Sequence, residues 1–413
     1  MVPLLEVYDS SSGNDVLVGR ARFSLRRSAL STVFSYDEGY LLQQHAYEID
    51  PAFPLQEGAA HCAGIPGVFR DSSPDRWGRH LIMREWETEA AERGVAPHQL
   101  DDVDFLIGVF DRTREGSLRF REPGSPFLAE AKPVPPLLQL PELLAASRAV
   151  AKDEAGRAQI KELLDAGSGS LGGARPKASV REEDKLLLAK FSHPHDSWDV
   201  MAWEKTMLDM AQDVGIRVPA SKLVRVGRES VLLLERFDRE GSLADGTRIP
   251  YMSAMTALQS DDGSSRDYAE LAEATVYRVD DAKAALAELF ARLAFFVCVN
   301  NTDDHMRNWG FLRKSNTWEL APLFDVNPNP ANNGHRVTAI LGTTGEEEIA
   351  SLWQFASYAG LTDAQARKTI ENVLRVTVQW EQYAMRNGCP EKERKLFAPL
   401  FAQRQTALST LIK

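Results

Sequence analysis

Cysteine is scarce in this chain, and the few that occur follow no pattern. Cys62, Cys298 and Cys389 are far apart in a sequence of 413 residues. Their wide spacing excludes a disulfide framework, and it offers no closely spaced pair for a zinc site. Sparse and unpatterned cysteines are typical of a reducing compartment, so we expect a cytoplasmic protein.

Long apolar runs are also missing. The most apolar helix candidate, residues 284–299, contains Glu288 and Arg292, two charges that a membrane-spanning helix would have to bury. The first ten residues, MVPLLEVYDS, lack the basic start and the long apolar core of a signal peptide. We therefore expect neither a membrane span nor a membrane partner.

Positive charge is in deficit. The chain has 48 Lys and Arg against 59 Asp and Glu, a formal net charge of −11 at pH 7. Proteins attract nucleic acid mainly through Lys and Arg that neutralise phosphates. The negative net charge therefore argues against a chain that binds nucleic acid through its overall electrostatic potential. It does not exclude a local basic patch. The length is sufficient for two or three domains with sizeable cores.

Proline marks the clearest boundary in the chain. Residues 122–142 hold six prolines in 21 positions, which denies a continuous helix or a central strand there. We predict a β-rich N-terminal subdomain over residues 1–125 and a proline-rich linker over 126–141. In the subdomain, alternating apolar residues around the turn SSGND predict an opening hairpin, and a helix is expected over about residues 75–93.

Beyond the linker, a small β-rich lobe is predicted over residues 142–237 and a helical lobe over 238–413. In the first lobe, a helical pattern runs from residue 140 to a stop at Gly167, and ASV, the turn REED and KLLLAKF predict a β-hairpin. An amphipathic helix and the strands SKLVRVG and VLLLERF follow. In the second lobe, PYMSAMTALQ, DYAELAEATV, AALAELFARLAFFVCV and the tail from residue 362 have helical periodicity.

A glycine-rich loop, GSGSLGGARPK, lies between the first helix and the hairpin. Gly167, Gly169 and Gly172 spell GxGxxG, but the dinucleotide fingerprint requires a strand before the loop and a helix after it. Here the order is reversed, as in a kinase flap whose backbone N–H groups lie over the nucleotide phosphates. A flexible Gly/Ser turn is the alternative.

Two further motifs follow the loop in the order of a kinase. Lys190 ends the strand LLLAKF, and Glu204 lies on the amphipathic helix, so the lysine could reach phosphates while the carboxylate orients it. Each residue taken alone would more often lie on the surface. The motif ERFDR, residues 235–239, ends the last strand, where its backbone could form an adenine-binding hinge or a turn closed by a Glu/Arg pair.

Three polar residues after the most apolar helix have the chemistry of phosphoryl transfer. Asp303 could accept the proton of an attacking hydroxyl, while Asn308 and Asp325 supply the oxygen ligands that Mg²⁺ prefers. A cap or turn would explain Asp303 or Asp304, but it does not explain Asp325 behind the strand signals WGFL and WEL, which would return it toward Asn308. His305 has two interpretations, a structural hydrogen-bonding residue or a contact to the nucleotide.

Together these motifs resemble the HipA family, the kinase toxins of bacterial type II toxin–antitoxin systems. The resemblance is carried, in order, by FRDSSPDRWGRHLI, SLGGARPK, LLLAKF, ERFDR, TDDHMRN and LFDVNP, which span most of the chain. It implies an α+β, protein-kinase-like fold of two lobes, with a small β-rich lobe, a helical C-terminal lobe and an extra N-terminal α/β subdomain. The implied activity is ATP- and Mg²⁺-dependent phosphorylation of serine or threonine in proteins.

The resemblance also implies roles for single residues. Asp303 is the catalytic base, and Asn308 and Asp325 are the metal ligands. Ser170 falls on the autophosphorylated position, where a phosphate would repel ATP and switch the kinase off; Ser168 and Ser179 are rival acceptors. The implied nucleotide-binding residues are Gly172, Gly173, Ala174, Arg175, Pro176, Lys177, Lys190, Glu235, Arg236, Phe237, His305, Phe324 and Asp325.

For partners, the resemblance implies a small, HipB-like helix-turn-helix antitoxin, with operator DNA contacted only through that antitoxin. It also implies a protein substrate, for which the family suggests an aminoacyl-tRNA synthetase. Two other functions stay open: a kinase-fold enzyme acting on a small molecule, and a catalytically idle co-repressor subunit. The presence of Lys190, Asp303, Asn308 and Asp325 argues against the idle subunit.

Overall fold

The chain forms two compact units, each assembled from separate stretches of sequence. The structure, a computed structural model, describes residues 4–27, 29–128, 133–168, 173, 175–243, 246–331, 335–345 and 347–413. The first unit comprises Met1–His195, Val226–Met252 and Leu312–Asn316, and the second comprises Asp196–Arg225, Ser253–Phe311 and Thr317–Lys413.

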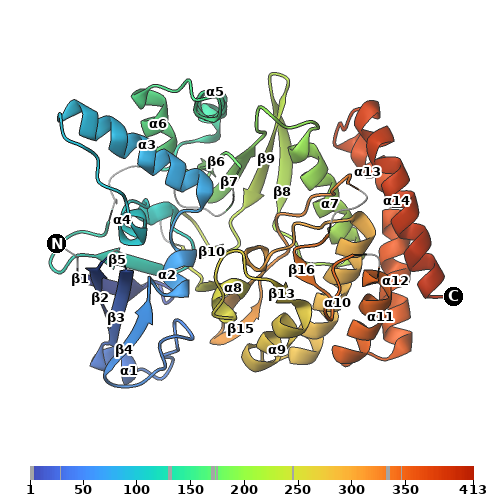
Figure 1. Cartoon of the computed structure of the whole chain (residues 1–413), viewed down its shortest axis with the longest axis horizontal. Coiled ribbons are helices and arrows are strands. Elements are labelled where there is room, and N and C mark those ends of the chain that lie inside the picture. Colours follow the sequence, from blue (N-terminus) through green and yellow to red (C-terminus); the bar gives the residue numbers. More distant parts are fainter. Residues whose placement is uncertain are drawn as a thin grey trace. The chain divides into compact units, whose positions relative to one another are not determined.

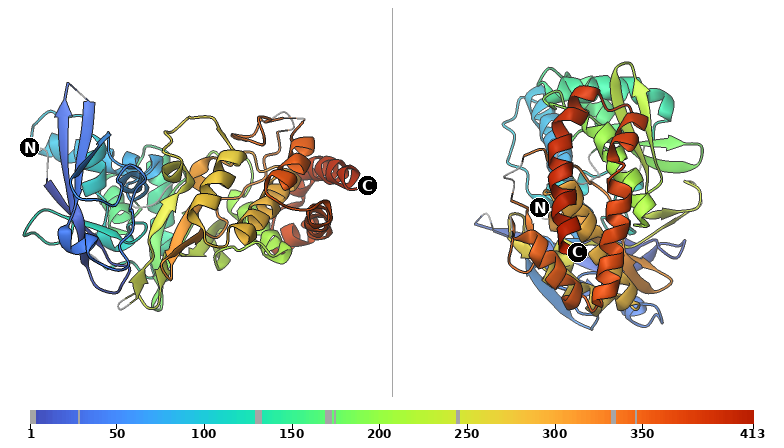
Figure 2. Two further views of the ribbon diagram at one scale, coloured as in Figure 1. Left: turned by 90° about the horizontal axis from the view of Figure 1, so that it is seen from below. Right: turned by 90° about the vertical axis from the view of Figure 1, so that its right-hand side faces the viewer.

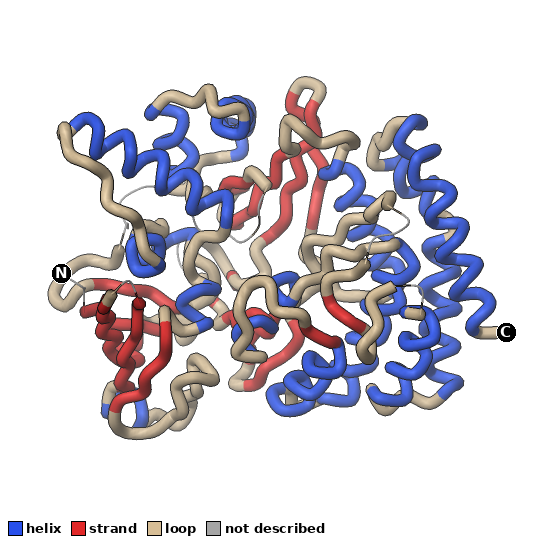
Figure 3. Tube along the Cα trace, viewed as in Figure 1, coloured by secondary structure: helices blue, strands red, loops and turns tan. Residues whose placement is uncertain are grey.

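An antiparallel five-stranded sheet opens the first unit (Figure 3). Along β2, Gly19, Ala21 and Phe23 are buried while Arg20 and Arg22 are exposed, the period-2 pattern of a sheet with one covered face. The predicted opening hairpin is confirmed, since β1 pairs with β2 around the SSGND turn. In the order β4-β3-β2-β1-β5, the strands are Ala59–Ala63, Ala29–Tyr36, Val16–Arg26, Leu4–Asp9 and Leu118–Arg121.

Helices complete the N-terminal part of the first unit, namely α1 (Glu38–Leu41), α2 (Gly67–Asp71), α3 (Arg76–Glu92) and α4 (Asp102–Ile107). The helix predicted over about 75–93 is therefore confirmed as α3, with Asp75 as its N-cap. The single helix predicted from residue 140 to Gly167 is wrong. It is divided into α5 (Leu140–Ala151) and α6 (Arg157–Asp165), because Asp153 has a left-handed backbone with φ of 60° and Gly156 begins a new helix.

The small sheet of the first unit is built on the predicted hairpin. Strand β6 (Lys177–Glu182) pairs with β7 (Lys185–Phe191), which pairs with β9 (Glu229–Glu235), all antiparallel. Strand β8 (Ser221–Val226), most of which belongs to the second unit, also forms where SKLVRVG predicted a strand. The hairpin follows α6 directly in the sequence, which confirms the predicted order of helix, loop and hairpin (Figure 1).

The second unit is mainly helical. The amphipathic helix is α7 (Val200–Val214), whose Trp203 lies 4.2 Å from the Phe397 ring centroid to centroid. Helices α10 (Ala282–Val299), α12 (Asp363–Thr377) and α14 (Glu391–Leu411) pack together, and Figure 2 shows α12 and α14 side by side. Further helices of this unit are α9 (Tyr268–Arg278), α11 (Glu348–Tyr358) and α13 (Trp380–Arg386).

Residues beyond 238 form more strands than the sequence predicts. PYMSAMTALQ is not one helix but β12 (Tyr251–Ser253) followed by α8 (Ala254–Ala257). Residues 249–257 are all buried, so their apolar pattern has no period that could separate a strand from a helix. The remaining strands are β10 (Arg239–Glu240), β11 (Thr247–Arg248), β13 (Arg266–Asp267), β14 (Gly310–Lys314), β15 (Thr317–Leu320) and β16 (Thr338–Ala339).

Among the residues that the structure describes, no helix is both long and apolar enough to cross a membrane.

Candidate functional site

Two buried lysines face each other in the small sheet of the first unit. Lys177 begins β6 and Lys190 lies near the end of β7, and the two are directly opposite each other in the ladder. Opposite residues project from the same face of a sheet, with Cβ atoms roughly 5 Å apart. Their side chains are only 3% and 6% exposed. This pair concentrates positive charge on one face of the sheet, which suits a phosphate group.

The end of the glycine-rich loop lies against Lys177 of this pair. Gly173 has φ of +105°, a backbone conformation that residues with a side chain rarely adopt, so glycine is favoured there. Its N–H donates to Asp75 Oδ2 at 2.7 Å. Pro176 is fixed by the sheet, because its carbonyl accepts a hydrogen bond from the Phe191 N–H at 2.9 Å.

The rest of the predicted loop lies partly outside the described residues, among them Ser170, Gly172 and Ala174. Both rival acceptors of a phosphate are described and fully buried. The Ser168 hydroxyl donates to the Lys177 carbonyl, and the Ser179 side chain is enclosed in β6. A hydroxyl must be exposed to be phosphorylated, so this burial disfavours Ser168 and Ser179.

At the predicted hinge, Glu235 and Arg236 make separate ion pairs instead of pairing with each other. The Lys185 ammonium group donates to Glu235 at 2.9 Å. The Arg236 guanidinium donates from Nε to Asp238 at 2.7 Å and from Nη1 to the Thr113 carbonyl at 3.0 Å. The Arg236 side chain therefore forms internal hydrogen bonds and is not free to bind a nucleotide.

Asp238 joins this hinge to the N-terminal part of the first unit. Its Oδ2 accepts hydrogen bonds from the Gly116 N–H and from Arg239, both at 2.8 Å. Burial alone would raise the pKa of Asp238, but Arg236 and Arg239 hold it well below its usual range. Phe237 in turn packs at 6.1 Å, centroid to centroid, from the Tyr251 ring. The backbone around Glu235–Phe237 is thus held rigidly.

One acidic residue that interacts electrostatically with Lys177 was not found from the sequence. Burial raises the pKa of Glu115 to about 8, an effect that Arg236 and Lys177 partly offset while Asp238 and Asp71 add to it. Each of these four partners is 44 or more positions from Glu115 along the chain, and Glu115 belongs to no motif. No local sequence signal could have identified it.

We expect Glu115→Gln to flatten the pH dependence of stability. The folded-state pKa of about 8 exceeds the usual 4.5, so the folded protein holds a proton that the unfolded chain releases between pH 4.5 and 8. Stability therefore falls as pH rises through this range, by a few kcal/mol, since one pKa unit corresponds to about 1.4 kcal/mol. Urea denaturation at pH 5 to 8.5 measures this. Glu87→Gln, at an exposed carboxylate, is the control, and equal slopes in both variants would contradict the prediction.

In the second unit, Asp303 and Asn308 lie in the loop that follows α10. The Asp303 carboxylate is exposed, and its backbone carbonyl accepts a hydrogen bond from Asn308 Nδ2 at 3.0 Å. A carbonyl can only accept, so the nitrogen of the Asn308 amide must point at it. The amide oxygen then points away and is available as a ligand. One loop thus presents a carboxylate and an amide oxygen.

The neighbouring acid, Asp304, has the opposite environment. It is fully buried, ion-paired to Arg336, and accepts hydrogen bonds from the Tyr268 hydroxyl at 2.6 Å and the Thr338 N–H at 3.3 Å. Arg336 also forms an ion pair with Oε2 of Glu348, and Oε1 of Glu348 pairs with Arg404. Asp304 therefore anchors the loop, which leaves Asp303 as the acid able to meet a substrate.

The chain after Asp325 returns to this loop. The Asn327 N–H donates to the Asn301 side chain at 3.2 Å, and the Asn329 N–H donates to the Asn300 carbonyl at 3.0 Å. Asp325 itself has φ of +57°, a conformation that costs a non-glycine residue free energy. Phe324 beside it is half-buried. This segment therefore lies beside Asn300 and Asn301 at the start of the loop, while the predicted approach of Asp325 to Asn308 stays a prediction.

His305 and Glu204 complete the predicted residues. Buried His305 Nδ1 has no hydrogen-bond partner among the described residues, so the structural hydrogen bond that the sequence left open is not made there. An orphaned ring nitrogen beside Asp303 is suited to a bound ligand. Glu204 lies on α7 with 1% of its surface exposed, which excludes the interpretation as a surface carboxylate.

The donor set of the second unit fits magnesium. The described residues contain no group of three or more His, Cys, Asp or Glu side chains placed to hold a metal. Mg²⁺, however, takes one or two carboxylates together with substrate phosphates and water. The Asp325 carboxylate and the Asn308 amide oxygen are of this type. Zinc sites in proteins are built mainly from cysteine sulfur and histidine nitrogen, which Asp325 and Asn308 do not supply.

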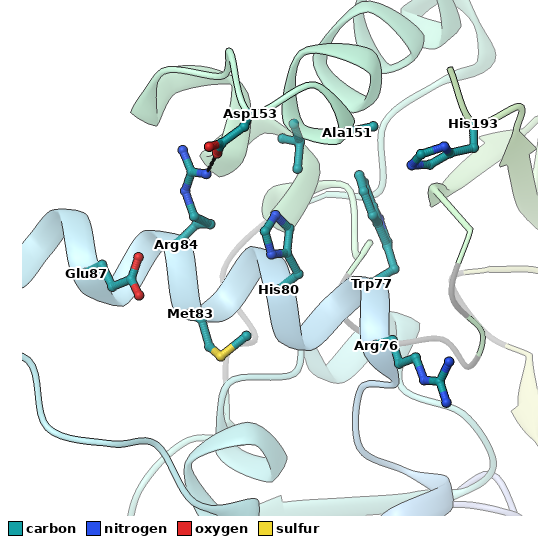
Figure 4. A pocket seen from close by; sticks show the side chains of 10 residues that line it. Arg76, Trp77, His80, Met83, Arg84, Glu87, Ala151, Asp153 and His193 are labelled. Atoms are coloured by element: carbon teal, nitrogen blue, oxygen red, sulfur yellow. Dashed lines mark hydrogen bonds and ion pairs between the residues drawn. The ribbon is translucent and has the colours of Figure 1, made fainter. Parts of the chain in front are cut away.

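A pocket of about 550 Å³ in the first unit is not part of these predicted sites. It lies along α3, the end of α5 and His193, and Figure 4 shows Trp77, His80 and Arg84 projecting from α3 toward it. Arg84 is ion-paired to Asp153. None of the predicted catalytic, metal-binding or nucleotide-binding residues lines this pocket.

Comparisons with known proteins agree with the order of these motifs. Residues 14–113 match the HipA N-terminal domain, and residues 169–380 match the HipA-like C-terminal domain. The second match alone covers half of the chain. No curated protein matches this chain.

Two solved structures are similar to this chain. HipA in the toxin–antitoxin complex of Shewanella oneidensis MR-1 with HipB and operator DNA is 17% identical, and the likeness covers 99% of this chain and 96% of that one with a TM-score of 0.68. The Helicobacter pylori proinflammatory kinase CtkA is 14% identical over 59% of this chain and 93% of that one, with a TM-score of 0.44.

The fold is therefore that of HipA, and the predicted α+β, kinase-like fold class is confirmed. The chain belongs to the HipA family.

Proposed function

We propose that this chain is an ATP- and Mg²⁺-dependent serine/threonine protein kinase that acts as the toxin of a toxin–antitoxin pair in the cytoplasm. One observation carries the proposal. The Asn308 amide is fastened to the Asp303 backbone carbonyl, so a single loop offers an exposed carboxylate and an outward-pointing amide oxygen. Family membership and the fold of the S. oneidensis HipA support the same activity.

In the proposed reaction the second unit performs the chemistry. Asp303 accepts the proton from the attacking serine or threonine hydroxyl, a role that requires an exposed carboxylate held at a fixed place. Asn308 and Asp325 hold Mg²⁺, which when bound would neutralise charge that develops on the phosphates. The buried Asp304 fixes the loop, and His305 contributes its unpaired nitrogen to the nucleotide.

The first unit binds the nucleotide in this proposal. Lys177 and Lys190 attract the phosphates, and the backbone of Gly172–Lys177 covers them. Glu235, Arg236 and Phe237 form the adenine hinge through their backbone, because the Arg236 side chain is already committed to Asp238. Phe324, next to Asp325, completes the set of nucleotide contacts.

The proposed control is autophosphorylation of Ser170 on the glycine-rich loop. A phosphoserine adds roughly 1.5 to 2 negative charges, which would repel the phosphates of ATP from the same loop. The burial of Ser168 and Ser179 supports Ser170 among the three serines. The proposed partner is a HipB-like antitoxin, which would supply the contact to operator DNA, because this chain has a net charge of −11.

Phosphoproteomics tests the proposal. The purified chain is incubated with Mg-ATP and host lysate, and we expect new phosphate on serine or threonine of a few host proteins, an aminoacyl-tRNA synthetase being the first to inspect, and on Ser170 of the chain itself. Turnover of ATP only after addition of a metabolite would identify a small-molecule kinase instead. ATP binding without any transfer would identify a catalytically idle co-repressor subunit.

We expect Asp325→Asn to weaken Mg²⁺-dependent ATP binding about tenfold or more, because the metal loses its carboxylate ligand. Asparagine keeps the side-chain size and tolerates the left-handed backbone that Asp325 adopts, so the fold should be retained. Calorimetric titration with ATP, with and without Mg²⁺, measures the effect. The exposed Asp363→Asn is the matched control. Unchanged affinity in the presence of Mg²⁺ would refute the metal-binding role of Asp325.

A further inference from the structure

Asp75 of the first unit makes two different hydrogen bonds with its two carboxylate oxygens. Oδ1 accepts from the Arg76 N–H at 2.7 Å and so caps α3. Oδ2 accepts from the Gly173 N–H, also at 2.7 Å, 98 residues away. The cap needs only one oxygen, because in the neighbouring helix Asp101 caps α4 with Oδ1 alone. The second oxygen therefore links α3 to the glycine-rich loop.

The bond to Gly173 uses a group that a phosphate would need. A loop that holds phosphates does so with backbone N–H groups, and each N–H has a single hydrogen to donate. In this structure the hydrogen of Gly173 points at a carboxylate oxygen, which has the charge sign of a phosphate oxygen. The Lys177 ammonium group lies against the same glycine. An anion of the protein thus already occupies one donor of the proposed phosphate loop.

The carboxylate is held on a well-anchored element. Helix α3 is 17 residues long, and its first turns are fixed by the buried side chains of Trp77 and Leu81. The positive end of the helix dipole stabilises an anion at its N-terminus. Asp75 is therefore a fixed acceptor, and Gly173 can leave it only by movement of the loop or by exchange for another acceptor.

We propose that Asp75 sets the affinity of this protein for ATP by occupying the Gly173 amide until a nucleotide phosphate displaces it. The inference rests on the proposed function, because it takes Gly173 as part of the loop that covers the phosphates. A charge-assisted hydrogen bond is roughly twice as strong as a neutral one, so the carboxylate competes better than a neutral side chain would. It also repels the incoming phosphates.

The test compares Asp75→Asn and Asp75→Ser with wild type in calorimetric titrations with Mg²⁺ and a non-hydrolysable ATP analogue. Both substitutions retain an N-cap acceptor for α3, and both remove the negative charge. We expect three- to tenfold tighter binding of the analogue in both variants. Affinity for adenosine, which has no phosphate, should stay unchanged. Asp101→Asn, which removes the same charge at the cap of α4, is the control and should bind like wild type.

Each other outcome has a definite meaning. Weaker or unchanged binding of the analogue by both Asp75 variants, with wild type binding normally, overturns this inference and leaves the proposed kinase function intact. A parallel change in adenosine affinity also overturns it, because the effect would then be structural. Failure of wild type to bind the analogue at all overturns both this inference and the proposed function.

Discussion

Asp303→Asn is expected to lower the rate of phosphoryl transfer by roughly 10²–10⁴-fold, the contribution of a positioned general base. Asparagine has nearly the same shape but cannot accept the proton of the attacking hydroxyl. The hydrogen bond from Asn308 goes to the backbone carbonyl of Asp303, which the substitution preserves. Nucleotide affinity should therefore stay within about twofold of wild type, because the change removes an interaction made only in the transition state.

Single-turnover transfer of labelled phosphate, measured together with calorimetric binding of Mg-ATP, separates these two quantities. Asp280→Asn, an exposed acid of the same unit, is the matched control and should transfer phosphate at the wild-type rate. Growth arrest of a host that expresses the chain should be lost with Asp303→Asn and kept with Asp280→Asn. A variant at position 303 that retains a tenth of the activity or more would show that another group is the base.

The elements that carry the candidate site could be predicted because their signals are local. The hairpin of β6 and β7 has an apolar strand on either side of a charged turn, and α7 and α10 have helical periodicity. Such patterns follow from the period of each element and need no knowledge of the tertiary structure. The HipA resemblance, which depends on the order of short motifs, is confirmed for the same reason.

What the sequence could not resolve depends on contacts between distant residues. Asp303 and Asp304 are adjacent and chemically identical in the sequence, and only the structure shows one exposed and the other buried against Arg336. The bond from Gly173 to Asp75 joins two motifs that the sequence analysis treated separately. Periodicity reports which face of an element is covered, but it does not identify the residues that cover it.

Arg336→Met is expected to destabilise the second unit by about 3–5 kcal/mol, the cost of removing one partner from a buried ion pair. The Arg336 side chain is fully buried and bridges two buried carboxylates, Asp304 and Glu348, the latter at 2.7 Å. Burial lowers the pKa of Arg336, but these two carboxylates raise it by more, so the guanidinium stays charged. Methionine fills similar volume but leaves both carboxylates without that partner.

Urea denaturation followed by circular dichroism measures this loss, and two further variants locate its cause. Arg404→Met removes a partner of Glu348 that is partly exposed, so a smaller loss is expected. The triple variant Arg336→Met, Asp304→Asn, Glu348→Gln removes all three charges together and should recover part of the stability, because an unpaired buried charge costs more than a neutral amide. If the single variant lost less than about 1 kcal/mol, or if the triple variant were less stable than the single one, the charges of this cluster would not be what anchors the loop.

Because Asp304 adjoins Asp303, the folded fraction of Arg336→Met should also transfer phosphate more slowly, whereas the folded fraction of Arg404→Met should keep a rate closer to wild type.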